Sequence, residues 1–173
     1  MSLLDRPSSE PSAARRLHWG HYHPRYVAGL LLLFAGGLAL AGSNTYVLSF
    51  LLLGTISHVG GWVILPGPGV RRTWVAAPSL VAVWLLLTGP QSVPVLVIPF
   101  VAWLFVRQRP ALSYLAALPV LAITLIIANL YSEHTAMPLA LAVSAIALIG
   151  SAWLARFIAR LGRTPSVFAA SSK

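Results

Sequence analysis

The imidazole of His58 is the side chain best placed for chemistry in this sequence. It is the only ionisable group well inside any long apolar stretch, here residues 46–65. An ionisable residue at such depth in a membrane is a candidate for proton or substrate handling. A neutral imidazole also forms hydrogen bonds between helices, worth about 0.6–2 kcal/mol. The sequence favours this structural role for His58, with proton or substrate handling as the alternative and metal or cofactor ligation as a third reading.

Hydroxyl side chains are the natural partners of such a histidine. Ser79, Thr124 and Ser144 lie at matching depth in other apolar stretches. Ser57 is adjacent in sequence, but neighbouring residues on a helix do not face each other, which disfavours a covalent Ser–His dyad. The candidate intramembrane polar site therefore comprises His58, Ser57, Ser79, Thr124 and Ser144.

Small residues flank His58 at helical spacing. Gly54 and Gly61 lie four residues before and three residues after it, so all three share one helical face. Small residues let the backbones of membrane helices approach closely. Gly36 and Gly37 form a similar point in the preceding apolar stretch. We expect these four glycines to be helix-packing positions.

Three further histidines precede the first apolar stretch. His18, His21 and His23 lie within six residues and could bind a transition metal. Gly20 and Pro24 disfavour a regular helix there, so the spacing does not encode convergence on one ion. An interfacial belt of polar and aromatic residues is the favoured interpretation, and no metal is expected.

A short polar segment follows residue 128. Asn129, Glu133 and His134 could bind a cation or transfer a proton, and Glu133 is the only acid outside the N-terminal tail. A solvated loop is the favoured interpretation. This segment is the candidate outer-loop site.

Enzyme signatures are missing from the sequence. It contains no glycine-rich phosphate loop, no GxSxG and no HExxH. It has no cysteine, which excludes thiol catalysis, disulfides and cysteine-bound metals. We therefore expect neither an enzyme nor a cofactor.

The composition predicts the elements that position these residues. Hydrophobic residues make up 58% of the 173 and charged residues only 9%. Long apolar stretches between short polar breaks are typical of a polytopic membrane protein, and lipid permits helices there. We predict an all-α bundle of six transmembrane helices within residues 26–163. The predicted spans are residues 26–42, 46–65, 73–88, 93–106, 111–131 and 138–157.

The remaining segments are polar. Residues 1–14 are expected to be a disordered cytoplasmic tail, and residues 164–173 a second cytoplasmic tail. Residues 15–25 mix basic and aromatic side chains, which is typical of a membrane interface.

The basic residues predict the orientation of the bundle. With six spans, all 12 Lys and Arg residues fall on one side, so the positive-inside rule places both termini in the cytoplasm. This partition also explains the net charge of +9 without a nucleic-acid partner. Basic residues near the surface attract anionic lipids by about 1 kcal/mol each. The expected lipid contacts are Arg15, Arg16, Arg25, Arg71, Arg72, Arg107, Arg109, Arg156, Arg160 and Arg163.

Three functions are consistent with these features. The first is a non-catalytic accessory, assembly or scaffold component that works through helix packing with a membrane-protein partner. We expect the chain to bind such a partner or to form a homo-oligomer. The second is a small oligomeric transporter or channel with His58 in its pathway. The third is a lipid-modifying membrane enzyme. Arginine outnumbers lysine eleven to one, a composition that fits a GC-rich bacterial genome. We therefore expect the protein in a bacterial plasma membrane.

Overall fold

The fold is taken from a computed structural model, which describes residues 21–43, 46 and 48–161. All regular elements within these ranges are helical, which confirms the predicted all-α class. Six are α-helices: α1 (Tyr22–Ala41), α2 (Leu48–Ile64), α3 (Gly69–Leu85), α4 (Val97–Val106), α5 (Ala117–Leu130) and α6 (Met137–Leu161). Four are short 3₁₀ segments: η2 (Leu86–Thr88), η3 (Pro90–Leu96), η4 (Ala111–Ala116) and η5 (His134–Ala136).

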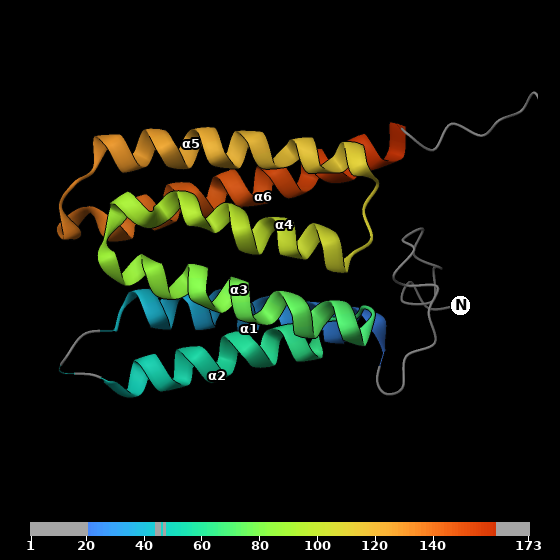
Figure 1. The fold of residues 1–173 in the computed structure, drawn as a ribbon, viewed down its shortest axis with the longest axis horizontal. Helices are drawn as coiled ribbons and strands as arrows, with labels where there is room; N and C mark the ends of the chain where they lie inside the picture. The colour runs from blue at the N-terminus through green and yellow to red at the C-terminus, as the bar shows by residue number, and fades with distance from the viewer. Residues whose placement is uncertain (1–20, 44–45, 47, 162–173) are drawn as a thin grey trace, which may run out of the picture.

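The helices run up and down along one common axis (Figure 1). α1, α2 and α3 form one half of the bundle, and α4, α5 and α6 form the other. The two halves meet mainly where α3 packs against α4. α2 lies at the outer edge of the first half and packs chiefly against α1.

Four helical segments in the described ranges are long and apolar enough to cross a membrane: Tyr22–Ala41, Gly69–Thr88, Ala111–Leu130 and His134–Leu161. Leu48–Ile64 and Pro90–Val106 are apolar but shorter. Large apolar side chains cover the outward faces of five helices. Leu31, Leu52, Val81, Leu118 and Ile146 are each at least 60% exposed. Such a surface suits contact with lipid and, with the four long apolar helices, is compatible with a membrane protein.

Two helices begin earlier than the sequence predicted. α1 starts at Tyr22, so the expectation that Pro24 prevents a helix there is wrong for residues 22–25. Proline is tolerated in a first helical turn because the backbone N–H groups there have no partner within the helix. α3 starts at Gly69, which places Arg71 and Arg72 in its first turn instead of in a preceding loop.

Prolines accompany the 3₁₀ segments that open the fourth and fifth spans, with Pro94 inside η3 and Pro110 as the N-cap of η4. Pro94 lies inside η3, where it removes one backbone donor and favours tighter turns. The fourth span accordingly reaches back to Pro90, and the fifth begins at Ala111 as a 3₁₀ helix before α5.

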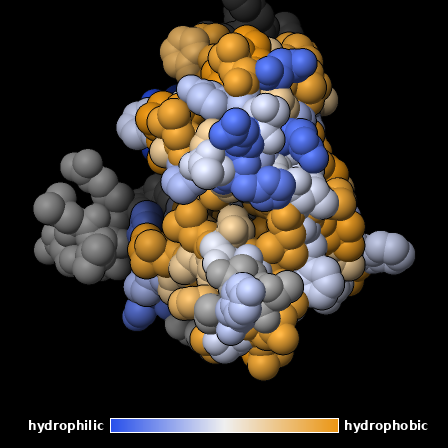
Figure 2. Space-filling view, turned by 90° about the vertical axis from the view of Figure 1, so that its left-hand side faces the viewer, coloured by the Kyte–Doolittle hydropathy of each residue, from blue (hydrophilic) through white to orange (hydrophobic). Residues whose placement is uncertain are grey.

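The two ends of the bundle differ in charge. The starts of α1 and α3 and the ends of α4 and α6 lie at the same end, on the right of Figure 1. All described arginines belong to these positions: Arg25, Arg71, Arg72, Arg107, Arg109, Arg156 and Arg160. The opposite end carries Glu133, and Figure 2 shows polar residues gathered there with hydrophobic surface around them.

Candidate functional site

His58 joins three helices near the middle of the first half of the bundle. It lies in α2 and is only 2% exposed. Its Nε2 is 2.9 Å from Ser79 Oγ on α3, and its Nδ1 is 3.3 Å from the carbonyl oxygen of Leu33 on α1. One turn along α2, the indole Nε1 of Trp62 lies 3.4 Å from the same Nε2. Both ring nitrogens are therefore engaged inside the protein.

The partners of His58 determine its tautomer. An indole N–H can only donate, so Nε2 must accept the hydrogen bond from Trp62. Nδ1 then carries the proton and donates it to the carbonyl of Leu33. The hydroxyl of Ser79 donates to Nε2 as well. We assign a neutral imidazole whose hydrogen-bonding capacity is fully used by α1, α2 and α3.

The distance between Ser79 and His58 equals that of a nucleophile and its base. However, Ser79 is fully buried, and it does not line the pocket described below. The pair therefore forms a buried hydrogen bond between α2 and α3, and we call His58 and Ser79 the polar clamp.

The other hydroxyl residues at matching depth do not reach His58. Thr124 Oγ1 donates to the carbonyl of Val120 at 2.7 Å, within α5. Ser144 Oγ donates to the carbonyl of Ala140 at 2.6 Å, within α6. Ser57 is half-buried on α2. Of the five residues in the candidate intramembrane site, the structure brings only Ser79 and His58 together.

Glycines bring α1 and α2 into backbone contact. A Cβ added to Gly36 would lie 2.8 Å from the carbonyl oxygen of Gly54, and one added to Gly54 would lie 2.9 Å from that of Gly36. Gly29 and Gly61 form an equivalent pair one heptad away, with a Cβ on Gly61 2.8 Å from the carbonyl oxygen of Gly29. These two pairs allow the close approach that lets His58 reach α1.

Gly37, unlike Gly36, does not lie at a close contact between the described helices. A Cβ there would meet only Val83 Cγ1, at 3.8 Å, which is ordinary contact. Gly37 lies one residue, or about 100°, around the helix from Gly36. Sequence reasoning also missed Gly29. The seven-residue spacing that relates Gly29 to Gly36 also relates Gly54 to Gly61, and it could have identified this position.

The candidate outer-loop residues do not converge. Asn129 Nδ2 donates to the carbonyl of Leu125, within its own helix, at 2.8 Å. Glu133 accepts a hydrogen bond from Thr135 Oγ1 at 3.3 Å. The His134 ring lies against Gly89, where a Cβ would come within 3.1 Å of it. This segment forms a loop contact with the turn after α3, not a shared site.

The histidines near the N-terminus are only partly described. His21 is the N-cap residue of α1, and the His23 ring lies edge-on to Tyr22 with centroids 5.7 Å apart. His18 lies outside the described residues. In the ranges that the structure describes, no three His, Asp or Glu side chains are grouped as a metal site would require.

Three of the expected lipid-contact arginines bond to helix ends. Arg25 Nε donates to the carbonyl of Ile64 at 3.2 Å, and Arg72 Nη1 donates to that of Leu65 at 2.9 Å. Arg71 Nη1 donates to the carbonyl of Phe105 at 3.2 Å. The last carbonyls of a helix have no partner within it, and positive charge is favourable there. These side chains therefore stabilise the ends of α2 and α4.

Arg107, Arg109 and Arg156 form a second group, which we call the arginine cluster. The Arg107 guanidinium is buried and lies 4.4 Å from the centroid of the Tyr26 ring and 5.3 Å from that of Trp103. Burial, together with smaller contributions from the like charges of Arg109 and Arg156, lowers the pKa of Arg107 to about 9. It remains protonated at neutral pH. Arg160 is exposed on α6, whereas Arg15, Arg16 and Arg163 lie outside the described residues.

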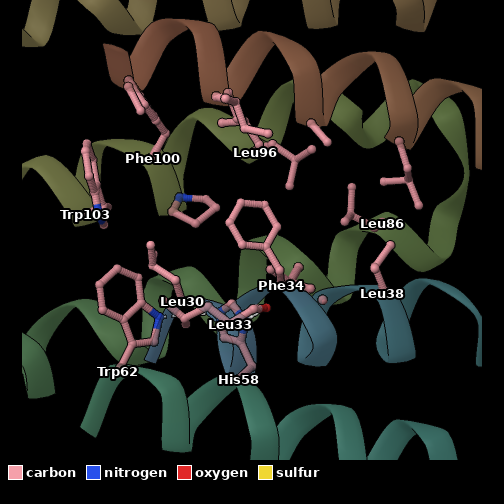
Figure 3. A pocket seen from close by; sticks show the side chains of 18 of the residues that line it. Leu30, Leu33, Phe34, Leu38, His58, Trp62, Leu86, Leu96, Phe100 and Trp103 are labelled. Carbon is pink, nitrogen blue, oxygen red and sulfur yellow. Dashed lines mark hydrogen bonds between the residues drawn. The ribbon is translucent and has the colours of Figure 1, made fainter. Parts of the chain in front are cut away.

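An apolar pocket of about 260 Å³ lies between the two halves of the bundle; we call it the interhelical groove. Phe34 from α1 and Leu96 and Phe100 from the opposite side point toward the same space (Figure 3). His58 and Trp62 line it from α2. The sequence did not predict this groove, because its walls come from helices far apart in the chain.

The chain matches no protein-family model, and comparisons with curated proteins and with solved structures found no match.

Proposed function

We propose that the chain crosses a bacterial plasma membrane six times, with both termini in the cytoplasm. α2 and Pro90–Val106, the two shorter apolar segments, reach 17 residues, the lower limit for a membrane-spanning helix. α2 also packs along α1 through two glycine pairs, so if α1 crosses the membrane, α2 crosses it beside α1 in the opposite direction. The arginines at one end of the bundle support a cytoplasmic location for that end.

Reporter fusions test this topology. A reporter that is active only after export should be inactive when fused after Lys173 and active when inserted after Glu133. The opposite pattern would refute the proposed orientation. Export of a reporter inserted after Gly67, in the turn between α2 and α3, would refute the six-span arrangement, because six spans with a cytoplasmic N-terminus keep this turn in the cytoplasm.

We further propose that the protein is a non-catalytic accessory, assembly or scaffold component that acts through helix packing. The observation that carries this proposal is that four polar side chains near the middle of the bundle make their hydrogen bonds within the protein. His58 and Ser79 bond to each other, and Thr124 and Ser144 bond to their own helices. These groups offer a solute no polar path. Transport through His58 would require breaking contacts with three helices.

The alternative functions depend on the same residues. A transporter or a lipid-modifying enzyme would need His58 to exchange a proton or to activate a nucleophile. His58→Gln keeps polar groups in the same space but cannot act as an acid or base near neutral pH. If the protein is a scaffold, the activity of this variant and its amount in the membrane should decrease only as much as its folded fraction decreases. Complete loss of activity in a fully folded variant would favour transport or catalysis.

Native mass spectrometry of the full chain, extracted from its own membrane in mild detergent, tests the scaffold proposal. We expect a reproducible complex with a different membrane protein, whereas a homo-oligomer alone would favour the transporter alternative. The experiment is then repeated with a Leu52→Ala and Ile56→Ala variant. Both residues lie on the exposed face of α2, so loss of the complex would show that this face binds the partner. Consistent isolation of a monomer under conditions that preserve other complexes would refute the proposal.

A further inference from the structure

The interhelical groove opens sideways along its length. Phe34 on α1 is 46% exposed, and Trp153 on α6 is 70% exposed, although both line the groove. The deeper lining residues Leu86 and Phe100 are at most 5% exposed. The groove therefore has an apolar floor and an open side between α1 and α6. In the proposed membrane arrangement that side faces lipid.

The groove has the length of one leaflet. Its lining on α1 extends from Tyr26 to Leu38, and that on α6 from Leu141 to Trp153. Twelve residues of helix cover about 18 Å. The hydrocarbon core is about 30 Å thick, so one leaflet contributes about 15 Å. A chain lying in the groove would span one leaflet and end at the height of Tyr26 and Trp153.

Aromatic residues and cations surround that end of the groove. Tyr26, Trp103 and Trp153 line it, and the guanidinium of Arg107 stacks on the first two. The charges of Arg109 and Arg156 act on both Tyr26 and Arg107. Aromatic side chains prefer the level of lipid headgroups, and clustered basic residues attract anionic ones.

The charge balance of the chain favours an anionic ligand at this end. The sequence has 12 Lys and Arg residues and 3 Asp and Glu residues, so carboxylates of the chain cannot neutralise most of the cations. Glu133 lies at the opposite end of the bundle. A phosphate beside the arginine cluster would be attracted by its positive charges, in addition to the contacts that Arg107 and Arg109 make within the chain.

The volume of the interhelical groove restricts which ligands it can bind. A cavity of about 150 Å³ accommodates benzene, so the groove, at about 260 Å³, has room for a slim flexible chain. A helix about 10 Å across and about 18 Å long would occupy about 1,400 Å³, far more than this volume. We propose that the interhelical groove binds one acyl chain of an anionic phospholipid from the cytoplasmic leaflet, with the phosphate at the arginine cluster. This inference rests on the proposed orientation in the membrane.

Native mass spectrometry of the delipidated full chain tests the site. Phosphatidylglycerol and phosphatidylcholine with identical acyl chains are added in separate titrations. We expect one phosphatidylglycerol to be retained with at least about tenfold higher affinity than phosphatidylcholine. Equal affinities would overturn the headgroup part of the proposal.

Matched variants locate each half of the lipid. Ala145→Phe fills the groove from α6, whereas Ala142→Phe places the same side chain on an exposed position that does not line it. We expect only Ala145→Phe to abolish retention. Arg156→Gln should weaken phosphatidylglycerol binding about fivefold, the effect of one basic residue near a headgroup, with Arg160→Gln as its control. Equal effects within either pair would overturn the assignment of that half.

A labelling experiment on the unmodified protein covers the case in which Ala145→Phe does not fold. Phosphatidylglycerol with a photoreactive group at the end of one acyl chain is added, and the labelled residues are mapped. We expect labels on groove residues such as Leu86, which is buried, and Leu141. Labels confined to outward residues such as Leu52 would overturn the proposal. A lipid in the groove without any protein partner would refute the scaffold function and leave this site intact, so the two failures can be told apart.

Discussion

Gly36 and Gly37 are adjacent in α1, yet the structure predicts opposite effects for the same substitution at the two positions. A Cβ on Gly36 would lie 2.6 Å from the backbone nitrogen of His58, whereas the nearest atom to one on Gly37 is a side-chain carbon at 3.8 Å. The atom facing Gly36 is backbone, so no rotamer change can make room. To restore an ordinary contact of 3.4 Å, α1 and α2 must separate locally by about 0.8 Å.

The magnitudes follow from two opposing effects. Alanine is favoured over glycine within a helix by about 0.8–1 kcal/mol, and this gain applies to both positions. Overpacking costs about 1–3 kcal/mol and applies only to Gly36. The separation would also lengthen the hydrogen bond from His58 to Leu33 on α1, already 3.3 Å. Gly36→Ala should therefore lower the free energy of unfolding by up to about 2 kcal/mol, and Gly37→Ala should raise it by up to about 1 kcal/mol.

Reversible unfolding in mixed detergent micelles measures the difference. The denaturing detergent is titrated, and the fluorescence of the six tryptophans reports the folded fraction. The reasoning would be refuted if the two variants unfolded at the same midpoint, or if Gly37→Ala were the less stable. Gly60→Ala on α2, where a Cβ would meet nothing within 4 Å, is a third reference for the gain in helix propensity.

Three further substitutions test other contacts by the same unfolding assay. Ser79→Ala should cost about 0.6–1.7 kcal/mol, because it removes one hydrogen bond to His58 at membrane depth, and no change would contradict the polar clamp. Arg72→Gln should cost about 1–2 kcal/mol by leaving carbonyls at the end of α2 without a donor; a neutral effect would mean that water replaces the guanidinium. Gly89→Ala should cost about 1–3 kcal/mol, since Gly89 has a φ of 112° that strains an alanine, while Gly150→Ala, in open space, should be neutral or stabilising.

The arginines illustrate where sequence reasoning needed tertiary information. Their position in the chain predicted one basic end of the bundle, and the structure places the described ones there. The sequence assigned all of them to lipid headgroups. The structure uses Arg25 and Arg72 to bond the carbonyl end of α2 and buries Arg107 between aromatic rings. A charge is attracted by lipid phosphate and by a helix end alike, so only the distances distinguish the two roles.

The helical class and the elements were predictable because they depend on local properties of the chain. Because the hydrocarbon core contains no water, the backbone of each long apolar stretch must form its hydrogen bonds within the stretch, and a helix achieves this. The depth of Ser79 along its helix followed from counting residues, and it placed this residue among the possible partners of His58. The face shared by Gly54, His58 and Gly61 followed from the helical period.

Contacts between helices were decided by the tertiary structure. The choice of Ser79 over Thr124 and Ser144 depends on α3, not α5 or α6, lying beside α2. The pairing of Gly29 with Gly61 depends on the register of α1 against α2. The interhelical groove exists because α1 and α6, at opposite ends of the chain, border the same space without closing it. A sequence determines its own helices through short-range hydrogen bonding, whereas a site between helices is set by how their surfaces fit together.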